Sequence, residues 1–368
     1  MTHAKLGASS ANRWMNCPGS IQFIAMQPEF FLDNSSEYAD EGTKAHAIAE
    51  ALLNKNLTLL SELEGQEIIE VEPEVDLQEA VETYTSYINN SLGPVDILHI
   101  EQKFFINEEF FGTNDACIEK IAENTLNVLD YKHGVGVPVE ATDNKQLKYY
   151  AIGAMTEFGT NYDKVTLTIV QPRSFHPDGP VRSWDTTPRK LLEFKDELFE
   201  AGEATKKKNA PLVAGNHCRF CPALAVCPAY KTMVMKAANA PGLADNLLLS
   251  EVLPKWKASV RRVAFNAMTK GVKLPGWKLV EGRTNRKWVD KDKVVEALRE
   301  AGKTDEEIFK SMEPQLNNLG TIEKMMGKNW VKDYVFKPVG ALTVAPESDK
   351  RPEFSKADQD FADIEIEV

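Results

Sequence analysis

The sequence contains no apolar run long enough to cross a lipid bilayer, which requires about 20 consecutive, mostly apolar residues in a helix. Its opening stretch, MTHAKLGASSANRW, lacks the apolar centre of a secretory signal peptide. No segment of the sequence repeats another. These absences argue against a membrane-spanning protein and against a repeat array. They predict a cytoplasmic protein with no membrane partner.

The sequence also has fewer basic residues than acidic ones. The chain has 43 Lys and Arg against 55 Asp and Glu, which gives a formal net charge of −12. Because phosphate binding requires a basic surface, this charge argues against a protein that coats nucleic acid unselectively. A local basic groove remains compatible with it. Hydrophobic residues make up 43% of the 368 residues, which is typical of a globular protein with two or three domains.

Cysteine is scarce, with five residues in the whole chain. Cysteines of a cytoplasmic protein rarely form disulfides, and Cys218, Cys221 and Cys227 follow the spacing C-x2-C-x5-C, which points to a metal. Cys17, in the stretch NCPGS, is the candidate for the fourth ligand. Cys117 lies in a predicted strand and is expected to be a small core residue. Four thiolates suit zinc or a [4Fe–4S] cluster, and the spacing alone leaves both open.

The periodicity of the apolar residues predicts both helices and strands. Helical spacing predicts helices over residues 41–56, 76–92, 144–158 and 188–207. Alternation of branched and aromatic residues predicts strands over residues 96–106, 115–122, 126–132 and 164–173. Residues 61–75 are expected to form a loop or a short extended piece, and residues 174–184 are turn-rich. The fold class is therefore predicted to be α/β (α+β).

The composition changes beyond residue 235, where short loops are expected to separate mainly helical segments. We therefore predict a first domain over residues 1–235, a helical region over 236–345 and a flexible acidic tail over 346–368. Trp277 and Trp288 lie in basic stretches of the helical region. They are expected either to stack on nucleic-acid bases or to belong to a helical domain with a solvated basic face.

The stretch LNVLDYKHGVG ends a predicted strand with Asp130 and Lys132. Residues two apart on a strand share a face, and a hairpin would bring Asp115 beside them. Two adjacent carboxylates repel each other unless a cation such as Mg²⁺ lies between them. A lysine there orients or deprotonates an attacking water, or stabilises charge on a phosphate. The alternative is an ordinary strand end that reaches solvent.

The stretches GTNDACIE, LDYKHG and QLKYY resemble the three core motifs of RecB-type nucleases in the PD-(D/E)XK superfamily. The stretch EGTKAHAIAE resembles an upstream histidine motif of the same nucleases. The resemblance implies a restriction-endonuclease-like core, with a mixed central sheet flanked by helices. It assigns Asp115, Asp130 and His46 as ligands of Mg²⁺ or Mn²⁺ and Lys132 as the catalytic lysine.

The resemblance also assigns roles to residues around these ligands. Gln146 and Tyr150 lie four apart on a predicted helix and therefore share a face, which in this superfamily looks onto the active site and DNA. Glu50 is expected either to orient His46 or to pair with a lysine. Glu101 is interpreted either as a carboxylate behind the ligands or, with more weight, as part of a solvated strand face.

One cysteine before the core and C-x2-C-x5-C after it resemble iron–sulfur nucleases of the AddB and CRISPR-adaptation type. This implies a [4Fe–4S] cluster on Cys17, Cys218, Cys221 and Cys227 that joins the two ends of the core, with zinc as the less favoured alternative. The stretches SSANRWMNCPGS and NKQLKYYAIGA add a resemblance to phage- and prophage-encoded RecB-like proteins.

Together these features predict a metal-dependent DNA nuclease. We expect an exonuclease that acts in phage recombination or DNA end processing, in the cytoplasm of a bacterial host. DNA is the expected partner, together with a recombination partner such as a single-strand annealing or binding protein, and a homo-oligomer is compatible with the sequence. The alternative is a DNA-binding or scaffold protein that retains the nuclease fold and its metal cluster without catalysis.

Overall fold

The computed structural model describes residues 4–33, 37–55, 57, 75–309 and 316–354. The chain divides into two compact units, Met1–Val260 and Arg261–Val368. The division falls within helix α8 (Leu243–Thr269) and not at residue 235, where the composition changes. Within the described ranges, no helix combines the length and the apolar character that a membrane crossing needs.

The first unit is built on a five-stranded sheet in the order β1-β2-β3-β4-β5. Its strands are β1 (Ile97–Phe105), β2 (Phe111–Lys120), β3 (Thr125–Tyr131), β4 (Lys164–Val170) and β5 (Val181–Thr186). Strands β3 and β4 are parallel and the other neighbours are antiparallel. The predicted fold class, a mixed sheet flanked by helices, is confirmed. Residues 174–184 were predicted to be turn-rich. This was wrong for the last four of them, because β5 begins at Val181.

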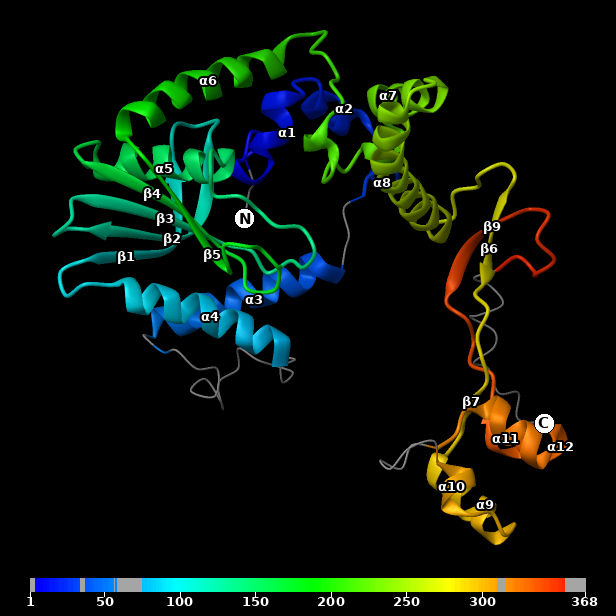
Figure 1. The fold of residues 1–368 in the computed structure, drawn as a ribbon. Helices are drawn as coiled ribbons and strands as arrows, with labels where there is room; N and C mark the ends of the chain where they lie inside the picture. The colour runs from blue at the N-terminus through cyan, green and yellow to red at the C-terminus, as the bar shows by residue number, and fades with distance from the viewer. Residues whose placement is uncertain (1–3, 34–36, 56, 58–74, 310–315, 355–368) are drawn as a thin grey trace, which may run out of the picture. The chain divides into compact units, whose positions relative to one another are not determined.

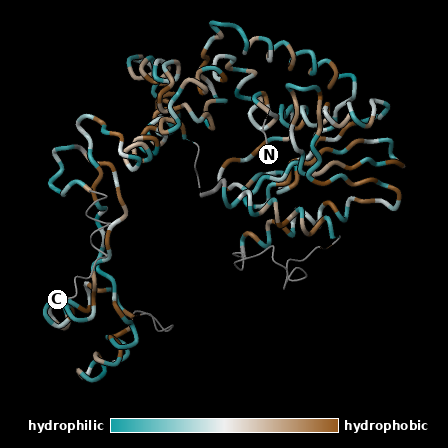
Figure 2. The backbone as a smooth tube through the Cα atoms, turned by 180° about the vertical axis from the view of Figure 1, so that it is seen from behind, coloured by the Kyte–Doolittle hydropathy of each residue, from teal (hydrophilic) through white to brown (hydrophobic). Residues whose placement is uncertain are grey.

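Helices cover both faces of this sheet (Figure 1). One face carries α1 (Ala11–Asn16), α5 (Lys145–Phe158) and α6 (Pro188–Lys206). The other face carries α3 (Glu37–Asn54) and α4 (Val75–Ser91). Strand β3 is buried at all seven positions because helices pack on both of its sides. Figure 2 shows the corresponding apolar stretches along the strands.

The sequence explains where these helices begin. The Asn144 side chain accepts hydrogen bonds from the backbone N–H groups of Gln146 and Leu147, and so caps α5. Thr187 caps α6 in the same manner, and Pro188 occupies its first position. The four predicted helices correspond to α3, α4, α5 and α6. The loop predicted over residues 61–75 lies almost entirely outside the described residues.

The N-terminal segment packs against a segment that lies about 200 positions later. It contains η1 (Ala8–Ser10), α1, α2 (Ser20–Met26) and η2 (Glu29–Phe31), and it meets η4 (Asn216–Cys218), η5 (Leu224–Val226) and the loop before them. The Gly19 backbone N–H donates to the Pro211 carbonyl oxygen over 2.9 Å. A Cβ at Gly19 would lie 2.5 Å from the Ala210 carbonyl oxygen, so only glycine permits this approach. Helix α7 (Pro228–Asn239) continues the later segment.

The second unit, for which a mainly helical region was predicted, contains short strands as well as helices. Strand β6 (Trp277–Glu281) pairs with β9 (Leu342–Pro346), and β7 (Lys287–Trp288) pairs with β8 (Val335–Phe336). Five buried side chains centre a small core: Val294, Leu298, Ile308, Ile322 and Val331. They come from the short helical elements α9 (Lys291–Glu300), α10 (Asp305–Ile308), α11 (Leu319–Met326) and α12 (Lys328–Val331), which η6 (Lys332–Tyr334) follows.

The predicted tail and the two tryptophans are placed within this unit. The Lys278 ammonium donates to the carbonyl oxygens of Asp349 and Arg351 over 2.7 Å, so the start of the predicted tail contacts β6. Residues 355–368 lie outside the described part of the chain. Trp277 is 45% exposed, whereas Trp288 packs against the core of the unit. Base stacking remains an expectation for both tryptophans, and the greater exposure of Trp277 favours it there.

Candidate functional site

Two carboxylates meet where β2 and β3 run side by side. The ladder that pairs Ala116 with Leu129 places Asp115 next to Asp130. The Asp115 carboxylate accepts a hydrogen bond of 2.6 Å from the backbone N–H of Tyr131. The sequence predicted a strand that starts at Asp115. In the structure β2 begins earlier, so Asp115 lies in the middle of the strand. The ladder nevertheless brings the two predicted carboxylates together.

Lys132 and α5 complete one side of this arrangement. The Lys132 ammonium lies 2.8 Å from the Asp130 carboxylate and donates to the Gln146 amide oxygen over 3.0 Å. The Gln146 amide nitrogen donates in turn to the Tyr150 hydroxyl over 3.4 Å. Burial lowers the pKa of Lys132, but the charge and hydrogen bond of Asp130 and the charge of Asp115 outweigh it and raise that pKa. The surroundings of Lys132 therefore favour its charged ammonium form.

Helix α3 supplies His46 from the other side. Its Nδ1 atom lies 3.4 Å from the Asp115 carboxylate and 3.8 Å from the Glu101 carboxylate. One donor atom from each of these three residues lies within 4.8 Å of the others. Burial lowers the pKa of His46, but the Glu101 hydrogen bond and the nearby carboxylates raise it above its ordinary value. An imidazole nitrogen and two carboxylate oxygens are ligands that suit Mn²⁺ or Mg²⁺.

Glu101 is the member of this group that the sequence analysis undervalued. Its backbone φ is 47°, a left-handed conformation that costs a non-glycine residue about 1–3 kcal/mol. It lies between two regular pairs of the β1–β2 ladder, opposite Asp115. No feature of the local sequence indicates a left-handed backbone at Glu101. The alternation of the strand therefore predicted only that Glu101 lies on a solvated strand face. Strained residues of this kind concentrate at functional sites.

Asp130 differs from its predicted role in one respect. The group of donor atoms within 4.8 Å contains Glu101 but not Asp130. Because Asp130 is only 1% exposed, its carboxylate is costly to bury, and the Lys132 ammonium 2.8 Å away offsets part of that cost. Glu50 is exposed on α3, and within the described residues no ion pair or hydrogen bond joins it to His46.

A second polar cluster, which the sequence did not indicate, holds α3 on the sheet. Arg173 donates to the Glu41 carboxylate over 2.7 Å, and its guanidinium also contacts the His133 ring. The other ring nitrogen of His133 lies 2.9 Å from the Tyr131 hydroxyl. Burial and the Arg173 charge lower the pKa of His133, which keeps the ring neutral. Glu41 precedes His46 by five residues on α3, so this cluster helps to fix where His46 points.

The carboxylates are in electrostatic conflict when no cation is present. Burial, followed by the charge of Asp130, raises the pKa of Asp115 from 3.8 to about 7, although His46 and Lys132 oppose the rise. The folded protein therefore holds this proton more tightly than the unfolded chain does. Its contribution to stability is complete below pH 3.8 and is lost as the pH approaches 7.

We therefore expect metal-free protein to lose stability between pH 4 and 7, by at most about 4 kcal/mol. Asp115→Asn removes the titrating group but keeps an oxygen that can accept from the Tyr131 N–H, so the pH slope becomes flatter. Urea unfolding in EDTA at several pH values measures the effect. Asp185→Asn is the control, because Asp185 lies exposed on β5 and pairs only superficially with Lys164. This variant is expected to show the same dependence of stability on pH as wild type. An equal slope in wild type and Asp115→Asn would contradict the assignment.

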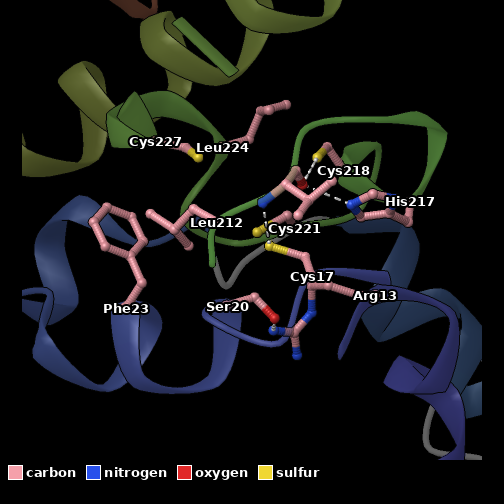
Figure 3. A pocket seen from close by; sticks show the side chains of 11 residues that line it. Arg13, Cys17, Ser20, Phe23, Leu212, His217, Cys218, Cys221, Leu224 and Cys227 are labelled. Carbon is pink, nitrogen blue, oxygen red and sulfur yellow. Dashed lines mark hydrogen bonds between the residues drawn. The ribbon is translucent and has the colours of Figure 1, made fainter. Parts of the chain in front are cut away.

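Four cysteines line one pocket, which Figure 3 shows. Cys17 follows α1, Cys218 ends η4, Cys221 lies in the loop after it, and Cys227 precedes α7. Cys117 lies elsewhere, fully buried in the core of the sheet, which confirms its predicted role as a core residue. Within the described chain, no three of the four pocket sulfur atoms all lie within 4.8 Å of one another.

The sulfur atoms of this pocket accept backbone hydrogen bonds. The N–H of Val213 donates to the Cys17 sulfur over 3.2 Å, and the N–H of Gly215 donates to the Cys218 sulfur over 3.4 Å. Such bonds orient thiolate ligands and tune metal centres. Burial raises the pKa of Cys218 to about 11, so a bound cation must displace the thiol proton. The donor set fits a thiolate-bound metal or cluster.

Comparison with known proteins finds a solved structure that is similar to part of this chain and a family model that matches most of it. A solved structure entitled "Crystal structure of SSO0001" is similar over 59% of this chain and 95% of that chain, with 13% sequence identity and a TM-score of 0.22. The family model described as "Protein of unknown function (DUF2800)" matches residues 3–352. That match covers both units of the structure. The chain therefore belongs to the DUF2800 family.

Proposed function

We propose that this protein is a Mg²⁺- or Mn²⁺-dependent deoxyribonuclease that hydrolyses phosphodiester bonds. The observation that carries the proposal is the convergence of His46, Glu101 and Asp115 beside the Asp130–Lys132 pair. These residues come from an α-helix and three strands, yet their polar atoms meet at one place. Carboxylates crowded together at half-buried positions repel each other unless a cation lies between them, so the arrangement supports a metal-binding role over a structural one.

Each residue has a role that follows from its surroundings. A divalent cation bound there supplies charge neutralisation for the attacking water and for the leaving oxygen. His46, Glu101 and Asp115 are the ligands whose donor atoms are already grouped. Asp130 is the fourth candidate ligand. Its carboxylate also holds Lys132, so it positions the one lysine of this group next to the cation site.

In this proposal Lys132 acts in its protonated, positively charged form. Its raised pKa favours the ammonium form, which stabilises negative charge on a phosphate oxygen or orients the attacking water. This argues against its use as the general base. Burial also raises the pKa of Tyr150 strongly, so its hydroxyl stays protonated and hydrogen-bonds with Gln146. Gln146 thereby fixes the direction of the Lys132 ammonium.

For the cysteine pocket, we propose a [4Fe–4S] cluster on Cys17, Cys218, Cys221 and Cys227. A single zinc ion with Zn–S bonds near 2.3 Å would hold its sulfurs about 3.8 Å apart, whereas a four-iron cluster separates its ligands more widely. The arrangement of Cys17 before the core and C-x2-C-x5-C after it, which resembles that of iron–sulfur nucleases, supports the cluster over zinc. Such a cluster would link the N-terminal segment to the segment that contains Cys218, Cys221 and Cys227.

The test is an incubation of the whole protein with end-labelled linear DNA and with circular DNA. Mn²⁺ or Mg²⁺ is expected to produce degradation of the linear substrate, and EDTA is expected to abolish it. Asp115→Asn is expected to be inactive under the same conditions. Loss of linear DNA alone supports an exonuclease, whereas cutting of circles supports an endonuclease. Binding without degradation under any metal would overturn the proposal in favour of a non-catalytic DNA-binding protein.

A further inference from the structure

Arg13 lines the cysteine pocket without being one of its candidate ligands. It lies on α1, four residues before Cys17, and its carbonyl oxygen accepts from the Cys17 backbone N–H over 2.8 Å. Its guanidinium donates to the Ser20 hydroxyl over 3.2 Å. Figure 3 shows Arg13 and Ser20 next to Cys17. The helix and this hydrogen bond therefore hold the guanidinium at the wall of the pocket.

The charge of Arg13 has no carboxylate partner among the described residues. A partly buried cation is costly unless a negative charge lies nearby. Burial lowers the pKa of Arg13, and the groups that oppose this are the thiols of Cys221 and Cys17 in their charged form. When the four cysteines are protonated and neutral, no negative charge among the described residues of the pocket therefore balances the positive charge of the Arg13 guanidinium. Four deprotonated cysteines around either a [4Fe–4S]²⁺ core or one zinc ion carry a net charge of two negative units, which the guanidinium partly neutralises.

We propose that Arg13 is a positioning residue for the metal centre, and that its guanidinium stabilises the negative charge of the thiolate-bound group. This inference rests on the proposed metal centre of the cysteine pocket. Its consequence is tighter retention of the metal. For an iron–sulfur cluster it also means a higher reduction potential, because reduction adds negative charge beside a fixed cation.

Arg219 provides a matched comparison. It lies in the same loop, between Cys218 and Cys221, and carries the same charge. Its side chain is exposed and lies over the Phe220 ring, 5.8 Å from the ring centroid. Unlike Arg13, it is not part of the pocket lining. Arg219→Gln therefore removes an equal charge from the same loop without changing the wall of the pocket.

The experiment compares wild type, Arg13→Gln, Arg13→Lys and Arg219→Gln as whole proteins that are reconstituted anaerobically with iron and sulfide, or loaded with zinc. Metal release to a chelator is measured by absorbance, and the potential of an iron–sulfur cluster by redox titration. Arg13→Gln is expected to weaken retention by about 10–100-fold, the usual range for groups behind metal ligands, and to make the potential more negative. Arg13→Lys is expected to restore part of both, and Arg219→Gln to match wild type.

Two outcomes are distinguishable. If wild type binds neither iron nor zinc, the metal centre itself is refuted, and the role of Arg13 falls with it. If wild type binds metal and Arg13→Gln releases it at the wild-type rate with the wild-type potential, only the role of Arg13 is refuted. Should Arg13→Gln fail to fold, Arg13→Lys decides the matter. A folded Arg13→Lys protein that retains no metal, under conditions in which Arg219→Gln retains it as wild type does, would refute the charge argument.

Discussion

Lys132→Ala is expected to lower the rate of DNA hydrolysis by about 10²–10³-fold, the usual loss when one positioned charge-stabilising donor is removed. The change removes the ammonium that lies 2.8 Å from Asp130 and leaves that carboxylate buried without its counter-charge. The site then keeps its candidate ligands but loses the ammonium that, in the proposed mechanism, stabilises charge on the phosphate. Initial rates on end-labelled linear DNA, with saturating Mn²⁺, measure the effect.

Lys164→Ala is the control for this experiment. Lys164 begins β4 and pairs with Asp185, at the end of the sheet opposite to Lys132. Because it is 45% exposed and its ion pair is superficial, its removal is expected to change neither the rate nor the fold. Hydrolysis by Lys132→Ala at the rate of Lys164→Ala would show that the lysine is not catalytic. Equal Mn²⁺ affinity in both variants would show that metal loss is not the cause of a difference.

Cys17→Ser is expected to release the metal of the cysteine pocket and to lower the melting temperature by about 10 °C or more, because metal binding contributes directly to folding. Cys17 is the one pocket cysteine in the N-terminal segment, so its loss removes the link that the proposed metal makes between that segment and the other three cysteines. A serine oxygen can still accept from the Val213 N–H, which limits the change to the metal. Metal analysis together with thermal unfolding measures both effects.

Cys117→Ala is the matched control for the cysteine experiment. Cys117 is fully buried in the sheet core, away from the pocket, and alanine leaves only a small cavity there. The variant is expected to keep the full metal content with a small loss of stability. Metal content that falls equally in Cys17→Ser and Cys117→Ala would indicate general unfolding and would refute a specific role for Cys17.

The sequence was sufficient for features that depend on local periodicity. Strand β3 and helix α5 were predicted within one or two residues, because their apolar spacing and the Asn144 cap are local signals. The neighbourhood of Asp130 and Lys132 followed from strand alternation. Asp115 was expected beside them, although its place in the middle of β2 depends on the length of that strand.

Features that depend on distant contacts were not predicted. Glu101 points toward His46 because of a left-handed backbone that only the completed ladder imposes. The Glu41–Arg173 ion pair joins residues 132 positions apart, and no local pattern signals it. Strand β6 finds its partner β9 more than sixty positions later, so the sequence indicated a mainly helical region without these strands. In each case the structure results from tertiary contacts and not from propensity.

The packing of the N-terminal segment has a consequence for biosynthesis. Gln22 donates to the carbonyl oxygen of Thr205, and Cys17 accepts from Val213, which lie 183 and 196 positions later. A ribosome exports the N-terminal segment first, so this segment must wait for its partners until the chain beyond Val213 has emerged. During that interval the buried side chain of Trp14 lacks part of its final environment. Closure of the first unit is therefore a late event of translation, and slow elongation prolongs the exposure of its earliest residues to chaperones and proteases.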